Sequence, residues 1–292
     1  GLMSDPNGET ATLAVTSLLK TASEGSVDRL LRRASAFLSD TRGDGDDERR
    51  IDVVRSLKRL CLSYPTRHRS VSTCLSNFLR DEGGYEFKRS IVDVMVDLMT
   101  SIDSPETTSS TLDHLCEYVE DCEYAALSTH VLHVLGRHGP ESERPARYVR
   151  FVYNRVILEN ATVRAAAVSA LTKFAARRPS LRPSILGLLR GSLTDEDDEV
   201  RDRAALAVRA LEGAMEENPY APPPEGAAWD EIPEDAPGEG DGAALLFLGG
   251  MPAAFSSFEE LERSLRAYAG TDAAGDETAL TFESLPAVGV VA

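Results

Sequence analysis

Several features that mark membrane proteins and enzymes are missing from this sequence of 292 residues. No apolar run approaches the roughly 18 residues that a membrane-spanning helix needs, and the stretch at 243–248 is far too short. The opening GLMSDPNGET lacks the basic start and apolar run of a secretory signal, so we expect none. No GxSxG, HExxH or phosphate-binding glycine loop occurs. The sequence therefore predicts no catalytic site and no cofactor.

Metal-binding and redox motifs are also missing. The four cysteines, Cys61, Cys74, Cys116 and Cys122, form no CxxC pair and fall among helical core positions, as expected of buried small side chains in a reducing cytosol. His130 and His133 flank apolar positions that claim the buried face, so no converging zinc ligands are expected. The acidic run at 195–199 lacks the spacing and central glycine of a calcium loop. We expect no metal site.

Basic residues are scarce in the last quarter of the chain. Residues 1–215 carry 32 acidic and 29 basic side chains, a balance of −3, whereas residues 216–292 carry 16 acidic and two basic ones, a balance of −14. Nucleic-acid binding requires a surplus of clustered basic side chains to neutralise phosphates. The sequence therefore predicts no nucleic-acid partner and a neutral body followed by an acidic region.

The chain contains the same helical pattern twice, 37 residues apart: VRAAAVSALTKF (163–174) and VRDRAALAVRAL (200–211). The apolar positions of the two copies superpose at i, i+4, i+7, i+8 and i+11, one stripe of an α-helix. The matched pairs are Val163 with Val200, Ala167 with Ala204, Ala170 with Ala207, Leu171 with Val208, and Phe174 with Leu211. A helix-pair period of this length predicts an all-α solenoid of HEAT or armadillo type, in which stacked pairs share a core and present an extended binding surface.

Amphipathic patterns predict eleven helices before residue 215 and no alternating strand. They are expected at about 9–22, 27–39, 47–63, 66–80, 85–102, 106–120, 123–137, 145–159, 161–177, 181–193 and 197–213. We divide the chain into a helical-repeat trunk (1–215), an acidic Pro/Gly-rich linker (216–255), a short terminal helix (256–270) and a loose tail (271–292). The acidic C-terminal region is expected to be disordered apart from that helix.

The segment RPARYVRFVYNRVILE, residues 144–159, combines a packed stripe with arginine and tyrosine on other faces. Val149, Val152 and Val156 share one helical face. Arginine and tyrosine are enriched at protein–protein hot spots because they combine contact area with directed hydrogen bonds. The candidate partner-binding residues are Tyr148, Arg150, Tyr153, Asn154 and Arg155. The alternative is a solvated basic face that pairs with neighbouring acids such as Glu159.

Several long blocks resemble the trunk of coatomer gamma subunits, and they occur in the order found in that family. The blocks are residues 18–40, 79–93, 115–140, YVRFVYNRVILENATVRAAAVSAL (148–171) and DDEVRDRAALAVRALE (197–212), with a weaker likeness at 255–270. The resemblance covers nearly the whole chain. It implies a non-enzymatic subunit of the COPI vesicle coat, without a cofactor.

The resemblance also implies a set of partners and a location. A gamma trunk holds the small zeta subunit and joins the beta–delta pair. The coat is recruited to Golgi membranes by a GTP-loaded Arf-family GTPase, whose main contact is expected upstream of Gly1. The expected location is therefore the cytoplasm, the Golgi membrane and the periphery of COPI vesicles, with peripheral membrane association through the coat.

The sequence departs from the family pattern at both ends, because earlier trunk helices and the β-rich C-terminal appendage are not in it. We therefore expect a fragment of a longer protein, with an insert at 40–50 and a linker at 218–242 that are unusually acidic. One rival reading is a free-standing HEAT scaffold of phosphatase or transport-receptor type outside the coatomer. The other is a helical-repeat DNA glycosylase, which the near-neutral body and the place of Trp229 in the acidic linker argue against.

Overall fold

The chain divides into two units, residues 1–248 and 249–292. A computed structural model describes residues 7–41, 47–102 and 104–217 of the first unit and residues 262–263 and 266 of the second. In the second unit, Arg266 Nη2 lies 2.6 Å from Glu262 Oε1. The predicted linker, terminal helix and tail otherwise fall almost wholly outside the described residues, as do residues 42–46 of the predicted acidic insert.

The described part of the first unit is helical and contains no β-strand, as predicted. Eleven α-helices match the eleven predicted ones, and their ends differ from the expected positions by a few residues. The α-helices are α1 (Gly8–Lys20), α2 (Val27–Asp40), α3 (Asp47–Ser63), α4 (His68–Arg80), α5 (Tyr85–Ser101), α6 (Pro105–Glu120), α7 (Ala125–His138), α8 (Pro145–Leu158), α9 (Ala161–Arg177), α10 (Arg182–Gly191) and α11 (Asp198–Glu217). Short 3-10 turns precede or follow several of them, among them η4 (Gly139–Glu141), η5 (Pro179–Leu181) and η6 (Ser192–Thr194).

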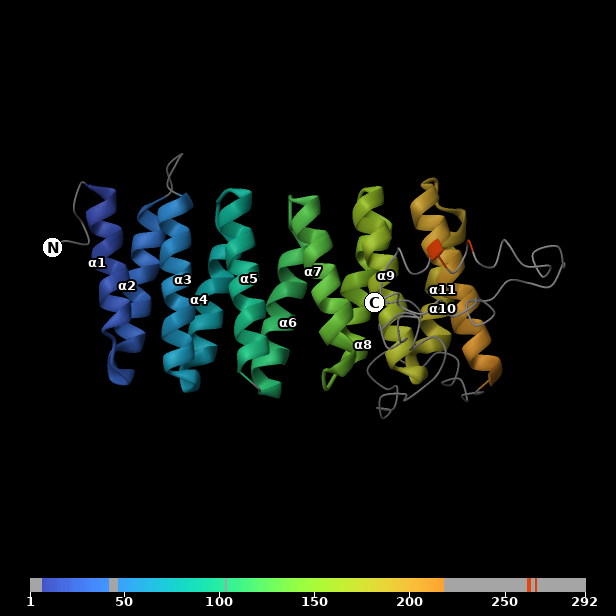
Figure 1. Cartoon of the computed structure of the whole chain (residues 1–292), viewed down its shortest axis with the longest axis horizontal. Helices are drawn as coiled ribbons and strands as arrows, with labels where there is room; N and C mark the ends of the chain where they lie inside the picture. Colours follow the sequence, from blue (N-terminus) through green and yellow to red (C-terminus); the bar gives the residue numbers. More distant parts are fainter. Residues whose placement is uncertain (1–6, 42–46, 103, 218–261, 264–265, 267–292) are drawn as a thin grey trace. The chain divides into compact units, whose positions relative to one another are not determined.

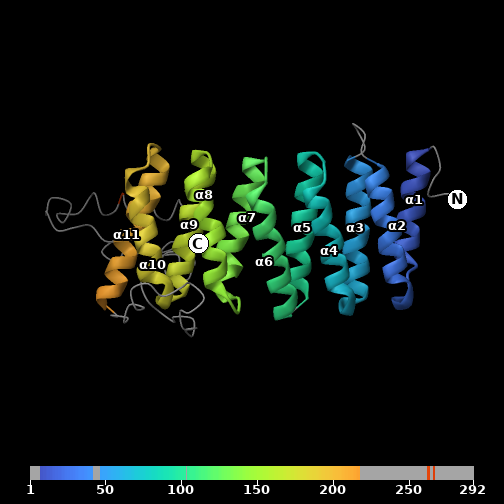
Figure 2. The ribbon, with the colours of Figure 1, turned by 180° about the vertical axis from the view of Figure 1, so that it is seen from behind.

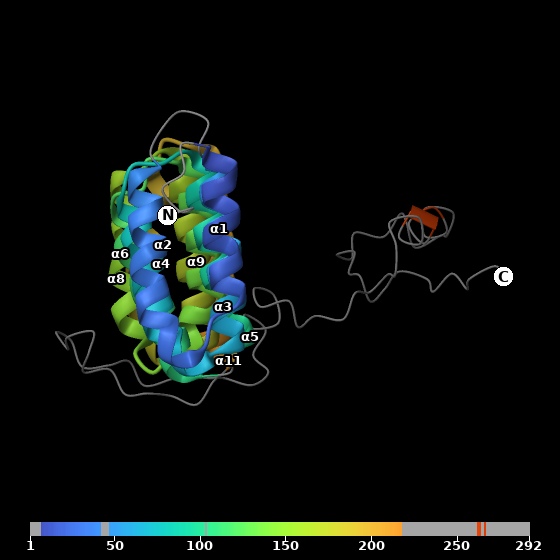
Figure 3. The same ribbon diagram turned by 90° about the vertical axis from the view of Figure 1, so that its left-hand side faces the viewer.

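The helices of the first unit stand side by side in chain order and form two layers (Figures 1 and 2). One layer contains α1, α3, α5, α7, α9 and α11, each packed against the next, and the other runs through α2, α4, α6 and α8. Figure 3, an end-on view, separates the two layers. Successive pairs stack in this way in HEAT and armadillo solenoids, which confirms the predicted fold class.

The core lies between the layers and is continuous from one helix pair to the next. Every apolar position of the duplicated pattern is buried, from Val163 to Phe174 in α9 and from Val200 to Leu211 in α11. Fully burying one of the larger side chains among them, such as Val163 or Phe174, contributes about 1.5–3 kcal/mol. The buried apolar side chains of the described helices join into one cluster, so each pair depends on its neighbours for its core.

Buried arginines connect one repeat to the next through backbone carbonyls. Arg155 Nη1 donates to Glu120 O at 3.1 Å, and Arg178 Nε donates to Pro140 O at 2.5 Å. Arg50 Nη2 donates to Glu82 O at 3.2 Å. Each bond spans between 32 and 38 residues of sequence, close to one repeat. These guanidiniums satisfy carbonyls that the ends of helices and turns leave without an intrahelical partner.

The four cysteines are free thiols, and Cys61, Cys74 and Cys116 are buried as predicted, whereas Cys122 is half-buried. Burial raises the pKa of the Cys61 thiol to about 11. None of the described helices has the length and apolar character needed to cross a membrane.

Candidate protein-binding surface on helix α8

Helix α8 begins at Pro145, whose missing N–H falls in the first turn, where helical N–H groups have no partner in the helix. Val149, Val152 and Val156 are buried, which confirms the predicted packed stripe. The helix packs against α9 and α6. The valine stripe therefore fixes the faces on which the other α8 side chains lie.

Tyr148 does not lie on an outer face as expected, because it is only 2 % exposed. Its hydroxyl donates to Asp113 Oδ1 on α6 at 3.1 Å. Burial, followed by the negative charge of Asp113, raises the pKa of the phenol. Tyr148 therefore joins two successive helices of the same layer, and its expected exposure was wrong.

Arg155 was also expected on an outer face, and this too is wrong, because the residue is 5 % exposed. Its Nη1 donates to Glu120 O at 3.1 Å and to Glu159 Oε1 at 2.8 Å. The pairing with Glu159 agrees with the alternative reading of the segment, but Arg155 is buried and Glu159 is half-buried, so the face is not a solvated one. A guanidinium held in this way has a structural role in the contact between α6 and α8.

The remaining predicted residues do reach the surface: Arg150 is exposed, while Tyr153 and Asn154 are half-buried. Ile157 and Leu158, which the sequence reasoning missed, are 61 % and 70 % exposed. Their spacing from the other three, about one and two helical turns, places them on neighbouring positions of the helix surface and was visible in the sequence. We call this set the α8 outer stripe: Arg150, Tyr153, Asn154, Ile157 and Leu158. Its role in binding remains a prediction.

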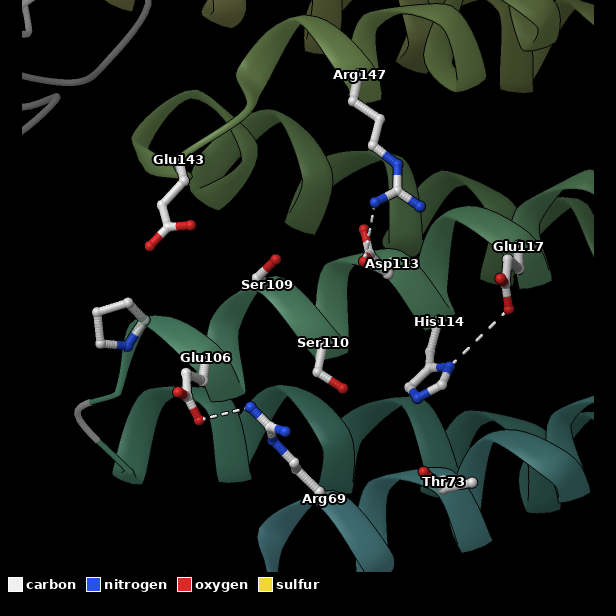
Figure 4. Close-up of a pocket in the computed structure, with 11 residues that line it drawn as sticks. Arg69, Thr73, Glu106, Ser109, Ser110, Asp113, His114, Glu117, Glu143 and Arg147 are labelled. Atoms are coloured by element: carbon white, nitrogen blue, oxygen red, sulfur yellow. Dashed lines mark hydrogen bonds and ion pairs between the residues drawn. The ribbon is translucent and has the colours of Figure 1, made fainter. Parts of the chain in front are cut away.

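A polar groove of about 540 Å³ lies between α4, α6 and α8, beside the start of the stripe's helix (Figure 4). Arg147 on α8 pairs with Asp113 on α6 at 3.1 Å, and Arg69 on α4 pairs with Glu106 on α6 at 2.8 Å. Figure 4 shows Arg147 and Arg69 reaching from α8 and α4, on either side of α6, to these two carboxylates. Two of the four carboxylates that line the groove, Asp113 and Glu106, are thus paired with its two arginines. Each such exposed pair contributes little to stability.

His114 also lines this groove, with its Nδ1 3.9 Å from Glu117 Oε2. That distance is too long for a hydrogen bond. Burial lowers the pKa of the imidazole, against the opposing effect of Glu117, so the ring is neutral at pH 7. Across the described helices, no group of three or more His, Cys, Asp or Glu side chains is placed to hold a metal ion.

The described helices therefore expose two neighbouring features: the α8 outer stripe, which is partly apolar and partly polar, and the polar groove beside it. Exposed aliphatic side chains beside an arginine and a tyrosine are the composition expected of an interface centre.

Comparison with known proteins identifies the family of the helical array. The family described as "Adaptin N terminal region" matches residues 2–214. Coatomer subunit gamma-2 of Oryza sativa subsp. japonica is 52 % identical over 212 residues, which are 73 % of this chain and 23 % of that protein. Coatomer subunit gamma-2 of Homo sapiens is 50 % identical over 211 residues, which are 72 % of this chain and 24 % of that protein. The matched region is thus about a quarter of the length of these relatives.

Among solved structures, a designed armadillo repeat protein is similar, at 12 % sequence identity, with a TM-score of 0.41 and coverage of 72 % of this chain and 97 % of that one. The stacking of helix pairs described above, rather than this likeness, establishes the fold. From the family match over residues 2–214 and the identity of about half of the aligned positions, the chain belongs to the adaptin N-terminal family, and its helical array is a segment of a coatomer gamma trunk.

Proposed function

We propose that this chain is a non-enzymatic scaffold segment of a COPI-type vesicle coat, and that other coat chains bind its helical array. The observation that carries the proposal is the identity to coatomer gamma subunits across the array, 52 % and 50 % in two relatives. An array of stacked pairs suits this role because its surface grows with each repeat while each repeat contacts only its neighbours. The proposed location is the cytoplasmic face of Golgi membranes and vesicles.

The proposed partner of the α8 outer stripe is the small zeta subunit of the coat. Permanent subunit contacts commonly bury more than about 2,000 Å² and place apolar and aromatic side chains at their centre. Ile157 and Leu158 supply exposed apolar area, and Arg150 has no ion-pair partner among the described residues. The beta–delta pair of the coat and an Arf-family GTPase are further proposed partners.

The α8 stripe can be tested in the full-length parent protein, co-expressed with the zeta subunit. A double variant, Arg150→Glu with Ile157→Glu, places two carboxylates on the stripe without touching the buried contacts of Arg155. The matched control is Arg32→Glu with Leu62→Glu, which makes the same charge change at exposed positions on α2 and α3. Circular dichroism of both variants serves as the control that their helicity is unchanged.

We expect the α8 variant to co-purify with at least about tenfold less zeta subunit than the unchanged protein, because replacing a hot-spot side chain costs more than about 1 kcal/mol and two are replaced. The control should retain it. Equal retention by both variants would remove the stripe as the binding site. Recovery of phosphatase or transport-receptor subunits in place of coat chains would instead favour the rival scaffold function.

A further inference from the structure

Two cationic side chains, Arg137 and Lys173, and the imidazole of His133 gather on the layer that does not contain α8. His133 and Arg137 lie on α7 and are exposed, and Lys173 lies on α9 and is half-buried. Helices α7 and α9 are neighbours in that layer (Figure 1). We call these three residues the α7–α9 cationic patch. It is formed by different helices from the α8 outer stripe and does not depend on the proposed coat function.

A close approach of the two helices holds the patch together. At Gly136 of α7, an added Cβ would lie 2.9 Å from Ala170 Cα and 3.4 Å from Lys173 Cδ. The first distance is shorter than real Cβ contacts, so only glycine fits without a shift of the backbone. The aliphatic part of Lys173 thus lies over Gly136, and its ammonium is held near the next residue of α7, Arg137.

The patch has no carboxylate to balance it within the described helices, where none of its three side chains forms an ion pair. The nearby acids already have partners: Asp93 lies 3.4 Å from His130 Nε2, and Glu141 lies 2.5 Å from Arg177 Nη2.

Like charges act on one another inside the patch. Burial, followed by Arg137, lowers the pKa of Lys173. Burial, followed by Lys173 and other cationic groups, lowers the pKa of His133. Both shifts mean that the protein environment disfavours the positive charge, so a negative ligand would relieve an unfavourable interaction.

The surroundings of the patch favour a narrow ligand over a broad membrane surface. Acidic residues lie on the flanking helices of the same layer: Asp97 on α5 and Asp202 on α11 are exposed, and Asp93 on α5 is half-buried. A flat anionic membrane would meet these carboxylates together with the patch, whereas an extended peptide can contact the patch alone. We propose that the α7–α9 cationic patch docks an acidic peptide segment of a partner protein, one that carries two or three neighbouring Asp or Glu side chains.

The test uses the full chain and a fluorescein-labelled hexapeptide of alternating Glu and Asp, with anisotropy read at about 50 mM salt, where surface charges are little screened. The test variant is Arg137→Gln with Lys173→Gln, and the matched control is Arg55→Gln with Arg59→Gln on α3 of the same layer. Both lose two positive charges at surface positions. A single Arg137→Gln variant, at an exposed position, guards against misfolding of the double variant.

We expect the double variant to bind the peptide about tenfold more weakly and the single variant about threefold more weakly, as for exposed ion pairs of modest strength. The α3 control should bind as the unchanged chain does. The proposal is overturned if the peptide does not bind, or if the α3 control loses as much affinity as the patch variant. It is also overturned if vesicles rich in phosphatidylserine, and not the peptide, lose binding in the patch variant.

Discussion

Replacing Arg155 by alanine tests whether buried arginines hold successive helix pairs together. The side chain is 6 % exposed and pairs with Glu159, which is 23 % exposed. Alanine would leave the Glu120 carbonyl at the end of α6 and the Glu159 carboxylate without their donor. Removing one partner of a buried ion pair costs about 3–5 kcal/mol, and a hydrogen bond to a charged group contributes about 1.5–3 kcal/mol. Because water reaches part of Glu159, we predict a loss of about 2–4 kcal/mol.

The loss can be measured by urea unfolding of the full chain together with hydrogen exchange. Repeat arrays do not always unfold as one unit, so hydrogen exchange supplies the local stability. We expect faster exchange at the end of α6 and through α8, and unchanged exchange in α1. The control is Arg150→Ala on the exposed side of α8, which should change stability by no more than about 0.5 kcal/mol. Equal effects of the two alanine variants would refute the role assigned to Arg155.

Three further predictions concern packing and pH. Gly136→Ala brings a Cβ to 2.9 Å from the α9 backbone and should destabilise the chain by about 1–3 kcal/mol in urea unfolding. The control is Gly187→Ala, which has open space around its Cβ and should stabilise the chain by up to about 1 kcal/mol. Burial lowers the pKa of His114, so the unfolded chain binds more protons than the folded chain near pH 6. The free energy of unfolding should therefore fall as pH drops through 6.5 towards the lowered pKa. A His114→Gln variant should show a smaller fall over that pH range. Hydrogen bonds from Arg164 at 3.0 and 2.7 Å are the chief cause of the lowered pKa of Asp195. The Asp195 carboxylate should therefore stabilise the fold above its ordinary pKa of 3.8, and this stability should be lost as pH falls through the lowered pKa. An Asp195→Asn variant should lose about 1–3 kcal/mol of stability at pH 7 and should no longer show that acid-dependent loss.

The fold could be predicted from the sequence because the spacing of apolar residues indicates which face of each helix is buried. The valines of α8 and the duplicated stripes of α9 and α11 are all buried, as their spacing requires. Proline residues also indicated the connections between helices, since Pro145 is the first residue of α8 and Pro179 the first residue of η5. These signals are local, so one sequence is enough to read them.

The surface was harder to predict, because burial of a polar side chain depends on what the neighbouring repeat offers. Tyr148 and Arg155 are buried by Asp113 and by the end of α6, which lie 35 residues earlier in the chain. That separation is close to the repeat of 37 residues, so the period could have indicated the contacts once the stacking register was fixed. The patch of His133 and Lys173 arises in the same way, from residues one repeat apart.

The central claim is that stacked helix pairs form a scaffold segment that other coat chains bind. Affinity purification of the full-length parent, with quantitative mass spectrometry of its companions, tests this most directly. We predict recovery of the coatomer zeta, beta and delta subunits in amounts equal to that of the parent. Recovery of the parent without coat subunits, or with subunits of another helical-repeat assembly, would contradict the proposed function.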